Sequence, residues 1–154
     1  MAASHIHLEA GTPALAAAAA EAAAREGLTW TGLRSDVFAA LSDADRPISA
    51  YDIADAVSAR LGRRIAANSI YRILDLFVEH NLALRVESRN AYVVNPHPAC
   101  RHHCIFLICE QCGAITHLDD DQLGDRMTRK AEVCGFRASR VVLEILGLCQ
   151  GCNA

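Results

Sequence analysis

The sequence predicts an α+β protein built from two parts. Residues 12–80 carry apolar side chains at helical spacing, and two short apolar runs typical of a β-hairpin follow between residues 82 and 94. Beyond the proline-rich segment 95–98, short strands alternate with one further helix. With 154 residues, 52% of them hydrophobic, the chain is long enough for one large domain or two small ones.

Capping residues predict the first three helices. Thr12 precedes a proline and an alanine-rich run that ends at Gly27, which is the pattern of an N-cap, a first-turn proline and a C-terminal stop. Ser49 is the expected N-cap of the third helix, with Asp52 three positions later as an acidic variant of the capping box. These helices are expected at residues 13–26, 33–41 and 50–61. Residues 1–11 show no periodic pattern and are expected to form a disordered tail.

A single apolar stripe predicts a fourth helix over about residues 68–80. The stripe contains Ile70, Ile73, Leu74, Phe77 and Val78. Two short runs, Leu82–Glu87 and Ala91–Val94, enclose a loop at Ser88–Asn90 and predict a hairpin. The order helix, helix, turn, helix, hairpin is the layout of a winged helix-turn-helix. Residues 12–94 are therefore expected to form a DNA-binding domain, with the fourth helix as recognition helix and the hairpin loop as wing.

Residues 95–103 are expected to form a hinge, because two prolines within three residues favour an extended linker. Residues 104–154 then predict a small α/β domain. Its expected elements are strands at Cys104–Cys109, Ala114–Leu118 and Arg140–Leu146, and a helix at Asp120–Cys134. Cys134 itself is expected to be an inert, buried thiol.

Two Cys-x-x-Cys pairs give the sharpest chemical signal in the sequence. They comprise Cys109 and Cys112 and, after 36 intervening residues, Cys149 and Cys152. Four thiolates complete the tetrahedral shell of a Zn²⁺ ion, which indicates a closed, structural site. The alternative is a thioredoxin-like redox couple, but that motif requires a helix directly after the first pair, where the sequence favours a turn and a strand.

A second group of metal-binding side chains lies around the hinge. It consists of His97, Cys100, His102, His103 and Cys104, with His117 in the following strand. Mixed imidazole and thiolate ligands suit Zn²⁺ and exclude Mg²⁺ or Ca²⁺ as the natural ion. Strand alternation is expected to place His102 and Cys104 on one face and His103 on the other. The alternative is a polar linker whose histidines are merely solvated.

The net charge of −3 gives no global sign of nucleic-acid binding, but arginines gather before the fourth helix. Four arginines and no acidic residue lie between Arg60 and Arg72. The candidate DNA contacts derived from this pattern are Arg63, Arg64, Ser69, Tyr71 and Arg72, with Arg89 in the wing. The alternative is an ordinary solvated helix face.

Other classes of protein are disfavoured. No Lys or Arg precedes Arg25, so a secretory signal is not expected, no segment is long and apolar enough for a membrane span, and a cytoplasmic location is favoured. A zinc enzyme needs an open metal position, whereas the four-cysteine site is closed, and no His-Glu-x-x-His pattern occurs. We therefore expect neither an enzyme nor a small-molecule substrate.

Several motifs resemble the ferric uptake regulator (Fur) superfamily, and most of all its zinc-sensing branch, the zinc uptake regulators. The matching segments are Ile48–Ile53, Ser69–Asp75, Val86–Tyr92, Phe106–Gly113 and Gly147–Cys152. They follow one another in the family's order over about residues 28–152.

This resemblance implies a homodimeric, zinc-responsive repressor of zinc-uptake genes. In the family, zinc at the hinge closes the dimer onto operator DNA. The resemblance assigns the structural zinc to Cys109, Cys112, Cys149 and Cys152, and at least one further zinc per subunit to regulation. It also places Tyr51, Tyr71 and Arg72 at DNA-contact positions.

The regulatory site departs from the family pattern. Leu84 and Asn95 stand where zinc-sensing relatives usually have a histidine and a cysteine, and His117 stands in place of a glutamate. His102 matches a family ligand. The expected sensor ligands are therefore His102, Cys104 and His117, then Cys100 and His97, with His80 as a further possible replacement. The alternative is a Fur-family regulator that senses iron, haem or peroxide through the same cysteines and histidines.

Overall fold

The computed structural model describes residues 11–98 and 103–153, and the chain divides into two compact units at residues 101 and 102. Unit 1 is the part up to Arg101 and unit 2 is the part from His102 onwards. The expected N-terminal tail, apart from Gly11, and part of the expected hinge, including Cys100 and His102, lie outside the described residues. The mixture of helices and small sheets confirms the predicted α+β class.

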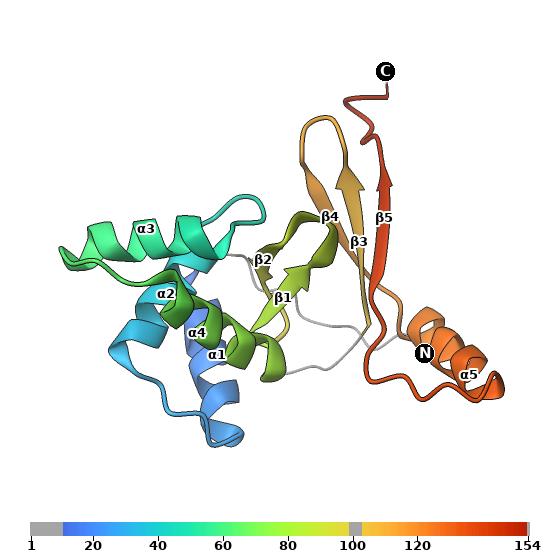
Figure 1. The fold of residues 1–154 in the computed structure, drawn as a ribbon, viewed down its shortest axis with the longest axis horizontal. Coiled ribbons are helices and arrows are strands. Elements are labelled where there is room, and N and C mark those ends of the chain that lie inside the picture. The colour runs from blue at the N-terminus through green and yellow to red at the C-terminus, as the bar shows by residue number, and fades with distance from the viewer. Residues whose placement is uncertain (1–10, 99–102, 154) are drawn as a thin grey trace. The chain divides into compact units, whose positions relative to one another are not determined.

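Four helices form most of unit 1 (Figure 1). They are α1 (Pro13–Arg25), α2 (Gly32–Ser42), α3 (Ala50–Leu61) and α4 (Ala67–Glu79). The side chains of Thr12, Thr31 and Ser49 cap the first three helices by accepting a hydrogen bond from a backbone N–H three residues later. Gly62 ends α3 and Asn81 follows α4, both in the left-handed conformation that stops a helix.

A β-hairpin completes unit 1. Strand β1 (Ala83–Val86) pairs antiparallel with β2 (Ala91–Val94), with Ala83 opposite Val94 and Val86 opposite Ala91. A short 3₁₀ turn (Glu87–Arg89) and the left-handed Asn90 connect the two strands. The predicted sequence of four helices and a hairpin is thus the observed one, which is the winged helix-turn-helix layout.

The helices and hairpin of unit 1 enclose one continuous apolar core. At its centre Phe77 of α4 is fully buried, and its ring centroid lies 5.9 Å from that of Phe38 and 5.8 Å from that of Trp30. Buried alanine side chains of α1 and α3 belong to the same core, which therefore consists largely of small and aliphatic side chains in a chain with only 5% aromatic residues.

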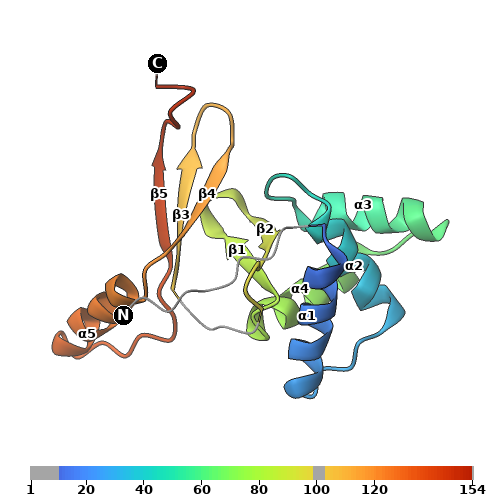
Figure 2. The same ribbon diagram turned by 180° about the vertical axis from the view of Figure 1, so that it is seen from behind.

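Unit 2 is a three-stranded sheet with one helix (Figures 1 and 2). Its elements are β3 (Cys104–Cys109), β4 (Ile115–Asp119), α5 (Asp121–Val133) and β5 (Leu143–Gly147). The central strand β3 is antiparallel to β4 and parallel to β5. The last strand begins at Leu143, three residues later than the sequence predicts.

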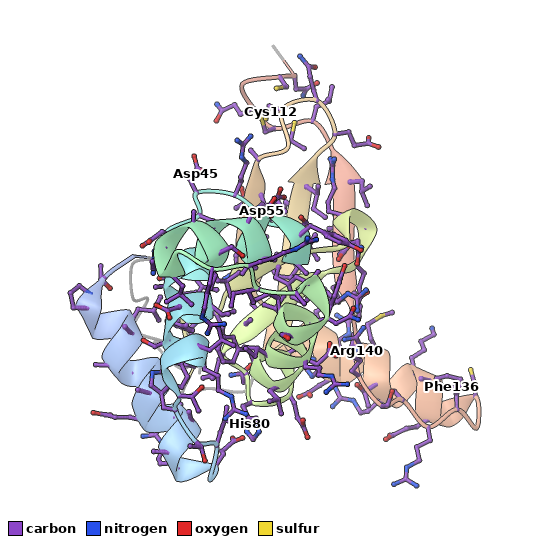
Figure 3. The ribbon with its side chains drawn as sticks, turned by 60° about the vertical axis from the view of Figure 1, so that its left-hand side comes forward. Asp45, Asp55, His80, Cys112, Phe136 and Arg140 are labelled. Atoms are coloured by element: carbon purple, nitrogen blue, oxygen red, sulfur yellow. The ribbon has the colours of Figure 1, made fainter. Side chains whose placement is uncertain are left out.

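One sequence expectation for unit 2 is wrong. Cys134, at the C-terminal end of α5, is exposed instead of buried. It stands beside two exposed apolar side chains, Val133 and Phe136, so the described residues of unit 2 form no core over this end of the helix (Figure 3). The apolar pattern of the sequence predicted that this face of α5 packs against another surface, but it did not identify that surface.

Candidate metal centre and DNA-binding surface

The four cysteines of the two Cys-x-x-Cys pairs meet at one end of the sheet in unit 2. Cys109 is the last residue of β3, and Cys149 follows β5 by two residues. Because β3 and β5 are parallel neighbours, with Cys109 opposite Gly147, the turns that follow both strands emerge at the same edge. Figure 3 shows Cys112 beyond this end of the sheet. The topology therefore joins two motifs that are far apart in the sequence.

Backbone hydrogen bonds shape the two turns that carry these cysteines. The N–H of Gly113 donates to the carbonyl of Cys109, and the N–H of Cys152 donates to the carbonyl of Cys149. Gly113 has a φ of 76°, which a residue with a side chain rarely adopts. Each tight turn thereby points both sulfur atoms of its pair to one place.

The sulfur geometry fits a tetrahedral metal ion. All four Sγ atoms lie within 4.8 Å of one another, and those of Cys112 and Cys149 are 3.7 Å apart. Four thiolates at about 2.3 Å from a zinc ion would stand about 3.8 Å from each other, whereas a disulfide needs about 2 Å. This donor set leaves no open coordination position, so it suits a structural zinc ion.

The backbone also tunes the ionisation of the cluster. Backbone N–H groups of Cys112 and Cys149 point at the Cys109 sulfur and lower the pKa of this thiol to about 6. Hydrogen bonds with the Cys149 and Cys112 side chains raise the pKa of Cys152 to about 12. The Cys109 thiol therefore loses its proton more readily than the Cys152 thiol, whose proton a metal ion would have to displace.

Two of the expected sensor ligands share one face of the sheet in unit 2. Cys104 begins β3, and His117 in β4 lies opposite Phe106, two residues further along β3. The rings of His117 and Phe106 are 5.7 Å apart, as expected for cross-strand neighbours on one face. Cys104 and His117 are therefore diagonal neighbours on that face.

His103 lies apart from this pair. Its ring packs onto the first turn of α5 so tightly that a Cβ atom at Gly124 would overlap it. Its Nε2 is 3.7 Å from a carboxylate oxygen of Asp125. His103 therefore packs against α5 and helps to hold this helix in place.

The remaining sensor candidates belong to unit 1 or are not described. His97 is buried there, at 3% exposure. The Nδ1 atom of His80 is 2.7 Å from a carboxylate oxygen of Glu26, a hydrogen-bond contact that joins the ends of α4 and α1. Leu84 is half-buried on β1. Asn95 is fully buried, and its side chain forms hydrogen bonds with backbone groups of Asn81 and His97. Neither residue offers the imidazole or thiolate that zinc prefers.

The arginine-rich segment lies on an exposed, concave surface of unit 1. Arg63 and Arg64 are exposed in the loop between α3 and α4, and they line a groove with Tyr51 and Asn68. The exposed Ser69 and Arg72 follow in the first turns of α4, where a recognition helix meets DNA. Arg89 is exposed in the turn between β1 and β2.

Two tyrosines extend this surface. The rings of Tyr51 and Tyr71 meet edge to face with centroids 6.0 Å apart, and Tyr51 is 64% exposed. The contact with Tyr71 limits the freedom of the Tyr51 ring, which lowers the entropic cost of any contact that this exposed ring makes with a ligand. Sequence patterns had not singled out Asp55 and Ser58, which also line the groove. Their positions four and seven residues after Tyr51 place them on the same face of α3, so the helical period of the sequence could have identified them.

Taken together, a winged helix-turn-helix unit and a unit with a four-cysteine metal centre define a metal-binding protein of the winged-helix class. No helix in the described ranges is long and apolar enough to cross a membrane.

The chain belongs to the ferric uptake regulator family, whose family model matches residues 25–146. It is 31% identical over 142 residues to the zinc uptake regulation proteins of Escherichia coli K12 and Shigella flexneri, which covers 92% of this chain and 82% of each relative.

Solved structures of zinc uptake regulators are also similar to this chain. A zinc uptake regulator in complex with zinc and DNA is 30% identical, with a TM-score of 0.84 over 91% of this chain and 93% of the other. The holo form of XcZur is 30% identical, with a TM-score of 0.81 over 92% of this chain and 99% of the other.

Proposed function

We propose that this protein is a zinc-responsive, DNA-binding transcriptional repressor that controls zinc-uptake genes. The observation that carries the proposal is the four-cysteine cluster in a chain that is similar, over nine-tenths of its length, to a regulator bound to zinc and DNA. The cluster binds one structural zinc ion through Cys109, Cys112, Cys149 and Cys152.

The operator-binding surface of this proposal is the groove and the start of α4. Its residues are Tyr51, Arg63, Arg64, Ser69, Tyr71 and Arg72, with Arg89 in the wing. Their support is exposure on a unit of winged-helix fold. Arginine side chains pair with phosphates and with guanine edges, so they supply both affinity and sequence preference.

A second zinc ion per subunit carries the regulatory signal in this proposal. Its ligands come from His102, Cys104 and His117, with Cys100 and His97 as further ligands, at the hinge of residues 95–103. The support is chemical, because these side chains are the donors that zinc prefers and two of them share one face of the sheet.

Coupling between zinc and DNA follows from linkage. Zinc at the hinge binds the closed dimer more tightly than the open one, and operator DNA does the same, so each ligand raises the affinity for the other. Residues 12–94 form the DNA-binding domain and residues 104–154 the dimerisation domain.

Apolar exposure in unit 2 supports the homodimer. Of the ten exposed large hydrophobic residues in the described chain, eight lie in unit 2. They are Leu118, Met127, Val133, Phe136, Val142, Ile145, Leu146 and Leu148. Apolar exposure on this scale indicates contact with a second chain, and the symmetric partner of a homodimer exposes the same residues.

Analytical ultracentrifugation of matched variants tests the dimer. We expect Ile145→Lys to weaken self-association by at least about tenfold, the cost of a charge in an apolar interface. Leu61→Lys, a comparable exposed position in unit 1, serves as the control. Equal association of both variants would contradict the assignment of the interface to unit 2.

Operator binding as a function of metal tests the function as a whole. A duplex selected from random-sequence DNA by the zinc-loaded protein is titrated with protein that holds one zinc per subunit, and then with added Zn²⁺. We expect the second equivalent to raise operator affinity at least tenfold, and Arg72→Ala to lower affinity in both states. If the operator affinity does not change when zinc is added beyond the first equivalent, zinc sensing is refuted.

The second candidate is a Fur-family regulator of another signal. It is favoured by one observation, that Leu84 and Asn95 supply no zinc ligand. Titration of the same duplex with Fe²⁺, haem and peroxide decides between the signals, because the true signal changes operator affinity and the others do not.

A further inference from the structure

Ser58 lies one turn before the end of α3 and lines the groove of unit 1. Its hydroxyl donates a hydrogen bond to the backbone carbonyl of Ala54, one turn earlier in the helix, at 2.6 Å. The same oxygen accepts a hydrogen bond from the backbone N–H of Ile65, seven residues later, at 2.8 Å. Both distances are those of well-formed hydrogen bonds. The hydroxyl therefore links α3 to the loop that connects it with α4.

The main chain of Ser58 holds the beginning of the same loop. The N–H of Gly62 donates to the Ser58 carbonyl, and so does the N–H of Arg63, at 3.3 Å. Gly62 makes this turn possible because its φ of 63° is in the left-handed region. The two oxygens of Ser58 thus accept hydrogen bonds from N–H groups on both sides of Arg64.

The loop has a buried anchor and an exposed basic part. The side chain of Ile65 is 7% exposed and belongs to the apolar core of unit 1. Its neighbours Arg63 and Arg64 are exposed and line the groove. The hydrogen bond from the Ile65 N–H to Ser58 therefore fixes the backbone directly after the two arginines.

We propose that Ser58 is a positioning residue for operator binding: its hydroxyl holds the loop that carries Arg63 and Arg64 in one conformation before DNA binds. The inference rests on the proposed function, because these two arginines are among the proposed DNA contacts. Side chains on an ordered backbone lose less entropy when they bind phosphate or guanine, so the hydroxyl raises operator affinity without touching DNA.

The helix itself gains nothing from a hydroxyl at residue 58. Serine is a poorer helix former than alanine, and a hydroxyl bonded to the carbonyl four residues earlier slightly destabilises a helix. The benefit lies in the loop, where the N–H of Ile65 would otherwise lose its partner next to the core. Ser58→Ala therefore removes the anchor of the loop while it favours the helix.

Three variants of the full-length, zinc-loaded protein test this role. Ser58→Ala removes the hydroxyl. Ser58→Thr retains a hydroxyl that can bond the carbonyl one turn earlier, so it is the conservative rescue. Thr31→Ala is the matched control for stability, because it removes another hydroxyl of unit 1 that accepts one backbone N–H, that of Arg34 at 3.3 Å, at the start of α2.

Amide hydrogen exchange gives the first readout. We expect the N–H of Ile65 to exchange at least about tenfold faster in Ser58→Ala, and at the natural rate in Ser58→Thr and Thr31→Ala. The N–H of Gly62 is an internal reference, because it donates to the main-chain carbonyl of residue 58, which the substitution retains. Its exchange should stay unchanged, whereas a general loss of stability would accelerate both amides.

Operator affinity gives the second readout, with the duplex selected from random-sequence DNA. We expect Ser58→Ala to lower the affinity at least about fivefold, and Ser58→Thr and Thr31→Ala to stay within about twofold of the natural protein. A double-mutant cycle then shows whether Ser58 acts through the arginines. In a protein that carries both Arg63→Ala and Arg64→Ala, Ser58→Ala should change the affinity by less than about twofold.

Three results overturn the inference. They are an unaltered Ile65 exchange in Ser58→Ala, an unaltered operator affinity in that variant, and an affinity loss that persists when both arginines are absent. A natural protein that binds the selected duplex no better than random DNA refutes the proposed function. A protein that binds its duplex selectively and is indifferent to Ser58→Ala refutes only the role of Ser58.

Discussion

The two units of this chain are stabilised in different ways. Unit 1 closes an apolar core that reaches from α1 to the hairpin. Among the buried hydrophobic residues of the described chain, only four belong to unit 2, and all four lie on β3: Ile105, Phe106, Ile108 and Cys109. A domain of about 50 residues with so small a core needs additional links, and unit 2 has a four-sulfur centre and an exposed apolar face to supply them.

The difference gives a physical reason for the position of the proposed zinc centre. In unit 2 the cluster ties the end of β5 to the end of β3, close to the C-terminus, where a short sheet would otherwise fray. Unit 1 has no comparable need, because side chains cap three of its four helices and its aromatic rings pack on one another. We therefore expect each unit to respond to a different perturbation.

Loss of one of the proposed zinc ligands should have the largest effect. We expect Cys112→Ser to remove much of the roughly 10 kcal/mol that a structural zinc ion contributes to folding, and to raise hydrogen exchange throughout unit 2 but not unit 1. Cys134→Ser, an exposed cysteine outside the cluster, is the matched control and should leave both units intact. If the amides of unit 2 stay protected in Cys112→Ser, the sheet does not depend on the metal.

Truncation of the central ring of unit 1 should have the opposite distribution. We expect Phe77→Ala to lower the free energy of unfolding of unit 1 by about 3–5 kcal/mol, because it leaves a cavity between Trp30 and Phe38. Denaturant unfolding followed by Trp30 fluorescence measures the change, and the zinc content should remain one structural ion per subunit. A matched loss of zinc would mean that the two units do not fold independently.

The pH dependence of zinc binding sharpens the description of the unit 2 centre. Protons compete with zinc for sulfur, so affinity falls as the pH falls. Cys109, with a pKa of about 6, joins this competition only below that pH, whereas Cys152, with a pKa of about 12, must release a proton throughout the neutral range. We expect the decrease in log affinity per pH unit to steepen below pH 6, in a chelator competition from pH 5 to 8. A constant slope through pH 6 would contradict the ionised Cys109.

The smallest expected effect concerns a buried hydroxyl group in the core of unit 1. The Tyr92 hydroxyl is buried and has no hydrogen-bond partner among the described residues, and burial raises the pKa of this side chain. Removing an unsatisfied polar group is favourable, so Tyr92→Phe should stabilise unit 1 by up to about 1 kcal/mol in chemical denaturation. Tyr51→Phe, on the exposed surface, should not change stability, and a destabilised Tyr92→Phe would reveal a partner for the hydroxyl.

Local sequence signals predicted the elements of unit 1 well. Thr12 and Ser49 act as the N-caps that their positions indicated, and Gly62 ends α3 in the left-handed conformation. These features depend on contacts within a few residues, so the sequence contains them directly. The burial of Cys134 was predicted wrongly. Its surroundings depend on what packs on α5, and local periodicity does not specify such long-range contacts.

The sequence by itself determined the order of helices and strands, the four cysteines of the cluster and the basic segment before α4, because spacing and residue type carry that information. Only the tertiary structure decided which distant residues meet. The parallel pairing of β3 with β5 brings Cys109 and Cys149 to one edge, and the register of β3 with β4 puts His117 on the face of Cys104. Likewise, the fold places the side chain of Asn95 in hydrogen bonds with backbone groups of Asn81 and His97, since a hydrogen-bond network exists only once the chain has folded.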